Sequence, residues 1–162
     1  TGGIPLRPGV RRLLEEARAA GLRLAVATTT SPENVSALLA HALAADGESW
    51  FEVIAAGDIV PAKKPAPDIY TWALKEMGLK PTQALAFEDS ENGVRASLGA
   101  GLKTIVTVNE YTRTHDFSGA ALVVDQLGEP GAPFKVLKGH ASGPIYVDVA
   151  LLRKVHAEAK VV

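Results

Sequence analysis

Two adjacent carboxylates, Glu88 and Asp89, follow a short apolar run that begins at Ala84. The run predicts a buried strand that stops at Phe87 or Glu88, and Ser90 is a good N-cap for a helix that follows it. Ligands of open α/β sheets bind beyond the carboxyl ends of the strands. Two acids at such a place can hold a hard cation such as Mg²⁺. A pair of solvated acids, with Asp89 only assisting the helix cap, gives the same sequence pattern.

A run of hydroxyl residues follows an earlier apolar segment. Thr28, Thr29, Thr30 and Ser31 come directly after residues 22–27, and the proline after Ser31 suits the first turn of a helix. Backbone N–H groups at a helix N-terminus favour anions, so this segment can bind phosphate. Ser and Thr are common at strand ends and caps, however, and need no ligand there.

Lys64 lies in a loop that two prolines stiffen, because a residue before a proline is pushed out of the helical region. A lysine held in such a loop can neutralise a phosphate or an acidic nucleophile as a compact point charge. Most exposed lysines only add solubility, and the neighbouring Lys63 is interpreted in that way.

The elements that must position these residues alternate regularly. Apolar residues at helical spacing predict helices at 8–20, 32–45, 67–77, 90–100 and 148–160. Period-two or β-branched runs predict strands at 22–27, 51–56, 84–88, 102–108 and 121–125. This alternation predicts an α/β fold, a parallel sheet with helices on both faces. The remaining stretches are interpreted as an opening loop (1–6), an irregular segment (109–119) and a glycine- and proline-rich tail (128–143).

Composition limits the classes of protein that remain. The 162 residues are the size of one domain, and the net charge of −1 gives no electrostatic reason to expect nucleic acid or an anionic membrane as a partner. The absence of cysteine excludes a thiolate nucleophile, a sulfur-ligated metal and a disulfide framework. With no signal peptide and no apolar run of membrane-spanning length, we expect a soluble, cytoplasmic protein.

Three segments together resemble motifs two, three and four of the haloacid dehalogenase (HAD) phosphatase superfamily. They are LAVATTT at 24–30, KPAPD at 64–68 and FEDS at 87–90. Further likeness to the CbbY type, a subgroup similar to β-phosphoglucomutase and associated with the Calvin cycle, lies in residues 25–35, 53–70, 88–96 and 111–120. The resemblance implies an HAD-like Rossmannoid parallel sheet.

The resemblance implies a phosphate-binding role for the hydroxyl run. The Thr28 hydroxyl and the Thr29 backbone would bind the phosphoryl group. Thr30 and Ser31 would face the other, non-reacting end of the substrate.

It also implies roles for the charged residues. Lys64 would pair with the nucleophile and with the transferring phosphate, and Asn92 would lie near that phosphate. Glu88 and Asp89 would help to hold Mg²⁺, directly or through water. Such an array suits phosphoryl transfer, which depends mostly on positioning and on charge neutralisation.

One part of the family plan has no counterpart in the sequence. The first motif is a strand ending in Asp-x-Asp-Gly-Thr, whose first Asp forms an aspartyl-phosphate and whose second is the general acid/base. The nearest look-alike, residues 145–148, has Ala150 in place of the second Asp, and Asp148 is better explained as a helix cap. The helical cap domain is missing too. We therefore expect residues 1–162 to be a partial HAD-like core domain, the C-terminal part of a longer protein, and inactive alone.

The missing strand lies, in the family's sheet, between the strand that ends at Ala27 and the strand that ends at Glu88. Its absence leaves two rows of unpaired backbone groups at the centre of the sheet. We expect the chain to be poorly stable, or to close the gap by moving its two halves together.

Three hypotheses for function follow. The intact protein is a monomeric, Mg²⁺-dependent phosphatase that acts on a small sugar phosphate, with the CbbY likeness implying xylulose-1,5-bisphosphate. A phosphosugar mutase of the β-phosphoglucomutase type would share motifs two to four, and only a substrate assay separates it from a phosphatase, because substrate choice in the family lies largely in the cap. A non-catalytic phosphate-binding domain would keep the phosphate cradle without the nucleophile, and an upstream Asp-x-Asp strand would exclude it.

Overall fold

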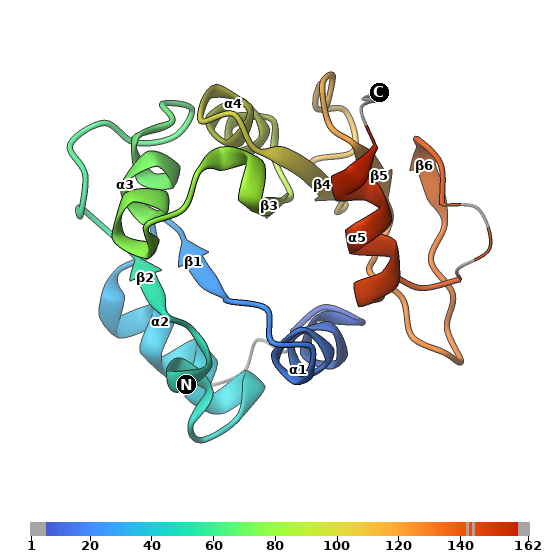
Figure 1. Cartoon of the computed structure of the whole chain (residues 1–162), viewed down its shortest axis with the longest axis horizontal. Helices are drawn as coiled ribbons and strands as arrows, with labels where there is room; N and C mark the ends of the chain where they lie inside the picture. Colours follow the sequence, from blue (N-terminus) through green and yellow to red (C-terminus); the bar gives the residue numbers. More distant parts are fainter. Residues whose placement is uncertain (1–5, 142, 144, 159–162) are drawn as a thin grey trace.

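Helices and strands alternate along most of the chain, as the sequence predicts (Figure 1). The structure is a computed structural model that describes residues 6–141, 143 and 145–158. The α/β fold class is confirmed. The greater part of the expected opening loop (1–5) and the expected end of the last helix near residue 160 lie outside the described residues.

Most of the elements lie close to their predicted places. The helices are α1 (Val10–Ala19), α2 (Pro32–Leu38), α3 (Asp68–Met77), α4 (Glu91–Gly99) and α5 (Val149–Ala157). The strands are β1 (Ala25–Ala27), β2 (Val53–Ala55), β3 (Leu85–Glu88), β4 (Lys103–Thr107), β5 (Leu122–Val124) and β6 (Val136–Lys138). A π-helical turn, Leu39–Leu43, continues α2, and short 3₁₀ turns occupy Gly47–Trp50 and Pro81–Gln83. Within the part of the chain that the structure describes, no helix is long and apolar enough to cross a membrane.

Side chains cap the helices where the sequence predicts. Ser31, Ser90 and Asp148 each accept a hydrogen bond from the backbone N–H three residues further on, at 3.3, 3.1 and 2.8 Å. Each bond satisfies one of the free donors at the first turn of a helix. Asp148 is therefore a helix cap, as predicted, and it begins α5.

The strands form two sheets. β1 pairs in parallel with β2, whereas β3, β4, β5 and β6 form a second sheet in that order. β1 and β3 do not pair with each other, and Figure 1 shows them as separate arrows at the centre of the molecule. The interruption falls where the sequence predicts a missing strand. Closure of the gap by direct pairing of β1 with β3, one of the two expected outcomes, does not occur among the described strands.

The interpretation of residues 128–143 as a tail without a strand is wrong at its centre. Val136–Lys138 form β6, which is antiparallel to β5, with Val136 opposite Val124 and Lys138 opposite Val123. Three residues are too few to show a period, and glycine and proline flank them. The free edge of β5, which local sequence does not reveal, decides this pairing.

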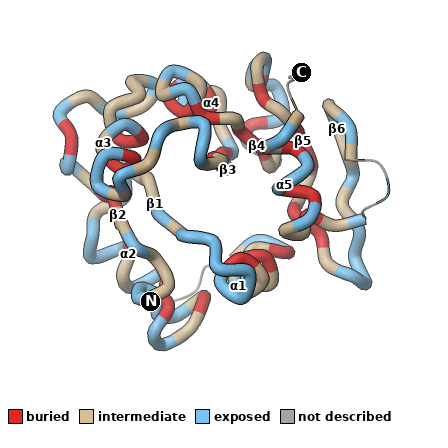
Figure 2. The backbone as a smooth tube through the Cα atoms, viewed as in Figure 1, coloured by how far each residue is buried: buried red, intermediate tan, exposed pale blue. Residues whose placement is uncertain are grey.

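Helices cover both faces of the larger sheet, as predicted. Successive residues of β4 and β5 point to opposite faces: Ile105, Leu122 and Val124 pack with α1 and α5, whereas Val106 and Val123 pack with α4. Figure 2 shows buried residues along β4, β5 and α5, whereas β1 has no buried residue: Ala25 is exposed and the other two are half-buried. Of the predicted strand at 22–27, only the part from Ala25 onward forms a strand.

Candidate active site

A cavity of about 310 Å³ lies at the carboxyl ends of β1, β3 and β4. Its lining residues are Ala27, Thr28, Lys64, Phe87, Glu88, Asp89 and Thr107. Parallel strands end at the same edge of their sheets, so residues from these three strand ends and from the loop that carries Lys64 meet here. The prediction that Thr28, Lys64, Glu88 and Asp89 share one cleft is confirmed; their roles stay predictions.

Lys64 bridges the two sheets across the cavity. Its Nζ donates to the carbonyl oxygen of Ala27, at the end of β1, at 3.1 Å, and to Oε2 of Glu88, at the end of β3, at 2.6 Å. The side chains of Lys64 and Glu88 are only 16% and 6% exposed. The ion pair is therefore poorly screened by water and salt, and it holds the ammonium in one place. Lys63, in contrast, pairs with the exposed Asp58 at 2.5 Å and does not line the cavity.

The carboxylate of Glu88 is constrained from three elements. The hydroxyl of Tyr70, on α3, donates to the same Oε2 that binds Lys64. The other oxygen, Oε1, lies against the first turn of α4, where a Cβ added to Gly93 would come within 1.9 Å of it. Burial, together with the negative charge of Glu88, raises the pKa of Tyr70 far above its ordinary value. The phenol therefore remains protonated and able to donate.

Asp89 differs from its neighbour because its side chain is exposed in the cavity. The cap of α4 is made by Ser90, so the alternative interpretation of Asp89 as part of a helix cap has no support. Residues 6–141, 143 and 145–158 contain no group of three or more His, Cys, Asp or Glu that could hold a metal ion. Mg²⁺ in phosphate sites takes one or two carboxylates and completes its shell with water and substrate. Asp89 fits such a ligand, and Glu88, already bonded to Lys64 and Tyr70, fits a contact through water.

The hydroxyl run divides into one cavity residue and three others. Thr28 lines the cavity, its N–H continues the ladder to the Ala55 carbonyl at 2.9 Å, and its hydroxyl oxygen accepts the Thr30 N–H at 3.1 Å. Thr29 and Thr30 are exposed, and Ser31 caps α2. These three are not among the lining residues.

Asn92 is exposed in the first turn of α4 and is not among the lining residues. It lies on the same turn as Gly93, which adjoins Glu88. Its expected position near a phosphate stays a prediction.

Sequence reasoning missed four residues that shape the site, of which Thr107, at the end of β4, lines the cavity. Tyr70 stands at helical spacing among apolar residues and is typical of a core position, so nothing marked its hydroxyl. Gly93 resembles any helix glycine until the carboxylate beside it is seen. His115 lies in the segment interpreted as irregular, yet its Nδ1 accepts the N–H of Glu91 at 3.0 Å and so ties that segment to the start of α4.

The sequence matches the family described as haloacid dehalogenase-like hydrolase over residues 2–101. The chain belongs to this family. It is 52% identical over 130 residues to protein CbbY of Cereibacter sphaeroides, covering 80% of this chain and 56% of that protein. It is 45% identical over 157 residues to the plasmid CbbY of Cupriavidus necator, covering 96% of this chain and 61% of that one. The chain thus spans little more than half of the length of these relatives.

Solved structures agree with this likeness. A mutant of CbbY from Rhodobacter sphaeroides in complex with xylulose-(1,5)bisphosphate is similar with a TM-score of 0.75 and 50% identity, covering 80% of this chain and 59% of that one. A putative β-phosphoglucomutase from Thermotoga maritima is similar with a TM-score of 0.59 and 35% identity, covering 64% of this chain and 47% of that one. The resemblance to the HAD superfamily and to the CbbY type is confirmed.

Proposed function

We propose that this chain is part of a Mg²⁺-dependent phosphatase that hydrolyses a small sugar phosphate. The observation that carries the proposal is the cavity itself, in which a fixed ammonium (Lys64), a hydroxyl residue (Thr28) and an exposed carboxylate (Asp89) meet at the strand ends. Phosphoryl transfer needs this combination, because catalysis depends on positioning and on neutralising charge around the phosphoryl oxygens.

Each cavity residue has one part in the proposed chemistry. Lys64 neutralises the phosphate and pairs with the attacking carboxylate. The hydroxyl of Thr28 donates a hydrogen bond to a phosphoryl oxygen. Asp89 holds Mg²⁺, with Glu88 in support through water. The metal, when bound, stabilises the negative charge that develops on the phosphoryl group. Contacts from the Thr29 backbone, Thr30, Ser31 and Asn92 to the substrate remain part of the proposal.

The substrate proposed is xylulose-1,5-bisphosphate. Support comes from the CbbY protein of 50% identity whose structure contains this sugar bisphosphate. A mutase remains the second candidate, because the chain is also similar to a putative β-phosphoglucomutase. A non-catalytic phosphate-binding domain is the third, since none of the lining residues is an Asp placed before a second Asp.

We further propose that residues 1–162 are a partial core domain, completed by a segment that carries the nucleophilic Asp. The inner edges of β1 and β3 have no strand partner among the described residues, and Phe87, on β3 beside the cavity, is 40% exposed. A strand between them would cover Phe87 and bring its own carboxyl end to the cavity.

The test is a phosphatase assay on xylulose-1,5-bisphosphate with the protein produced from its whole coding sequence. We expect phosphate release that needs Mg²⁺, and an Asp89→Asn variant with weaker Mg²⁺ binding and strongly reduced turnover. The amide lacks the charge that Mg²⁺ sites use for affinity. Asp46→Asn, at an exposed acid directly before the 3₁₀ turn Gly47–Trp50, is the matched control.

Two results would contradict the proposal. An Asp89→Asn variant with the parent's magnesium midpoint and turnover would exclude Asp89 as a ligand. Turnover by residues 1–162 alone, lost in Asp148→Asn, would show that the cap of α5 is the missing nucleophile.

A further inference from the structure

Tyr70, Glu88 and Lys64 form a chain of hydrogen bonds that leads from the core to the cavity. Tyr70 lies in α3 and is 9% exposed, and its hydroxyl donates to Oε2 of Glu88. The same oxygen accepts from Nζ of Lys64 at 2.6 Å, and that Nζ lies 5.1 Å from the centre of the Tyr70 ring. A phenol and an ammonium therefore share one carboxylate oxygen.

The sharing affects the charge that Lys64 presents to the cavity. A carboxylate oxygen that accepts a hydrogen bond from a phenol interacts less strongly with a second donor, here the Lys64 ammonium. Without the phenol, Oε2 would face Lys64 alone, and the buried ion pair would tighten because little water screens it. Less of the ammonium's charge would then be available to a phosphate group.

The hydroxyl also restricts where the carboxylate can point. Oε1 is confined by the first turn of α4 at Gly93, and Oε2 is held toward α3 by Tyr70. Loss of the hydroxyl leaves Lys64 to hold Oε2 from the cavity side, so the carboxylate gains freedom to turn toward the cavity. An anion there would repel a phosphate dianion.

We propose that Tyr70 is a positioning residue of the phosphate site. Acting through Glu88, its hydroxyl keeps the Lys64 ammonium at the cavity wall, where Glu88 neutralises only part of the positive charge and the rest can attract a phosphate group. The inference rests on the proposed function for the nature of the ligand. A phenol is protonated at neutral pH, so the hydroxyl is a donor to Glu88.

The test is Tyr70→Phe, which keeps the ring in its apolar cluster and removes only the hydroxyl. The first measurement is the ¹H–¹⁵N NMR signal of the Lys64 ammonium, which reports its hydrogen-bonded surroundings without any ligand. We expect this signal to shift in the variant. The second is calorimetric titration with inorganic phosphate, for which we expect affinity to fall about three- to ten-fold, a fraction of what one hydrogen bond to a charged group is worth.

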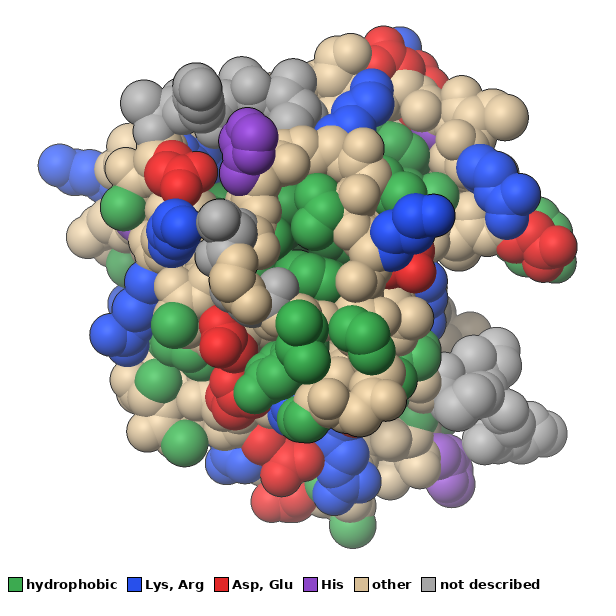
Figure 3. Space-filling model, turned by 90° about the vertical axis from the view of Figure 1, so that its right-hand side faces the viewer, with side chains coloured by type: hydrophobic (Ala, Val, Ile, Leu, Met, Phe, Trp, Pro, Cys, Tyr) green, Lys and Arg blue, Asp and Glu red, His purple; other side chains and the backbone are tan. Residues whose placement is uncertain are grey.

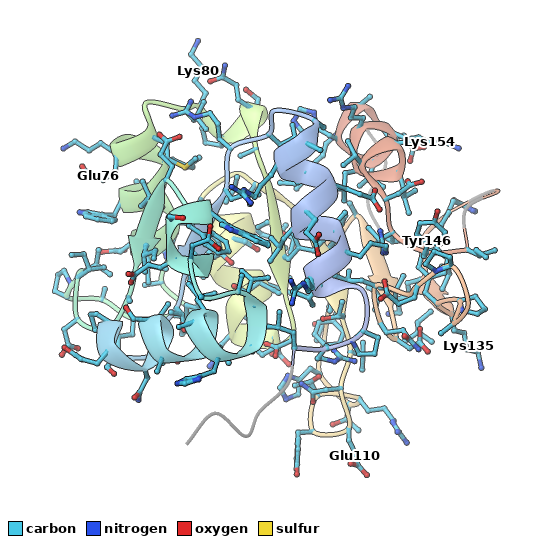
Figure 4. The ribbon with its side chains drawn as sticks, turned by 90° about the horizontal axis from the view of Figure 1, so that it is seen from below. Glu76, Lys80, Glu110, Lys135, Tyr146 and Lys154 are labelled. Atoms are coloured by element: carbon cyan, nitrogen blue, oxygen red, sulfur yellow. The ribbon has the colours of Figure 1, made fainter. Side chains whose placement is uncertain are left out.

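A matched control makes the same chemical change elsewhere. Tyr146 lies on the outer side of the C-terminal part, away from β1 (Figure 4), with its ring 4.5 Å from the Arg12 guanidinium. Tyr146→Phe should leave both the ammonium signal and the phosphate affinity unchanged. Thermal melts of all variants establish that each is folded at the temperature of the measurement.

A double-mutant cycle separates positioning from a general structural role. If Tyr70 acts through the charge of Glu88, Tyr70→Phe should change phosphate affinity by less than about two-fold in a Glu88→Gln background, because the coupling resides in that contact. An equal loss in both backgrounds would overturn the inference, and so would a Lys64 signal that Tyr70→Phe does not move. A parent protein that binds no phosphate would overturn the proposed function instead, and the Lys64 signal alone would then decide the role of Tyr70.

Discussion

The two sheets differ in how completely the chain covers them. In the larger sheet all three residues of β5 are buried, and Ile105 and Val106 of β4 are 0% exposed. In the smaller sheet β1 is three residues long, begins with the exposed Ala25 and has one neighbouring strand. Apolar burial is the main stabilising term in folding, so the larger sheet carries most of the stability. The cavity lies where the two sheets meet, at the ends of β1, β3 and β4.

The two regions also differ in their polar links. Arg12 ties α1 to the C-terminal segment through Glu129 at 2.7 Å and through the carbonyls of Gly128 and Val147, each at 2.8 Å. Across the inner edges of β1 and β3, Lys64 reaches from the Ala27 carbonyl to Glu88. In the first region a charged group holds a packed structure together. In the second a charged group spans an interruption and lines a cavity.

The outer face of the C-terminal part shows that apolar exposure is not confined to the cavity. Figure 3 views the molecule from the β6 side and shows hydrophobic side chains gathered among charged ones. Leu137 of β6 is 46% exposed and Ile145, in the segment before α5, is 49% exposed. The difference between the two regions therefore lies in strand pairing and core packing, and exposed apolar side chains occur in both.

The largest expected effect compares one isoleucine from each sheet. Ile105→Ala should destabilise the chain by about 3 kcal/mol, because it removes a fully buried side chain from β4 and leaves a cavity. Ile54→Ala, at a half-buried position in β2, should cost about 1 kcal/mol for the same reason on a smaller scale. Urea denaturation measures both. Equal losses would mean that the two sheets contribute alike to stability.

The next effect tests how tightly the cavity is built. Gly93→Ala should destabilise the chain by about 2 kcal/mol, because the added methyl group overlaps the Glu88 carboxylate and must displace it. Gly99→Ala, at the end of the same helix, is the control. Its added Cβ would lie 3.3 Å from the Cβ of Pro67, and the change should alter stability by less than about 1 kcal/mol. A tolerated Gly93→Ala variant with unchanged phosphate affinity would show that Glu88 is not held where the structure places it.

A smaller effect compares two helix caps. Asp148→Ala should cost about 1 kcal/mol of stability, since α5 packs against the larger sheet, beside Ile105 and Leu122, and unfolds with it. Ser31→Ala should cost about half as much, because α2 has only seven residues and its start is largely exposed. Thermal melts would check the order. A greater loss at Ser31 would reverse the assignment of stability to the two regions.

The smallest effect lies at the opposite end of the smaller sheet from the cavity, where Arg23 pairs with Glu52. Hydrogen bonding from Arg23 holds the pKa of Glu52 below its ordinary value. A carboxylate with a lowered folded-state pKa adds stability above its unfolded pKa, and this stability is lost as pH falls toward the folded value. Arg23→Gln should raise the Glu52 pKa and flatten that acid dependence, with a small effect at neutral pH because the pair is exposed. NMR titration of Glu52 measures the shift. An unchanged pKa would show that Arg23 does not lower the pKa of Glu52.

Local sequence predicted much of the fold and part of the site. The caps at Ser31, Ser90 and Asp148 were predictable because a cap depends on residues three positions apart. The segments around Thr28, Lys64 and Asp89 were predictable as cavity residues because strand ends can be located from apolar runs. The larger sheet's alternation of Ile105 and Val106 between two cores follows from the period of a strand.

Other features depended on contacts between residues far apart in the chain. The pairing of β6 with β5, the separation of β1 from β3, and the hydrogen bond from Tyr70 to Glu88 have no local pattern. Glu88 and Asp89 are neighbours of the same charge in the sequence, yet one is buried against Lys64 and the other is exposed. The sequence located the strand ends that border the cavity, because strand ends and caps are local. Only the tertiary structure decided what each residue does there, because a carboxylate's partners are set by the elements packed around it.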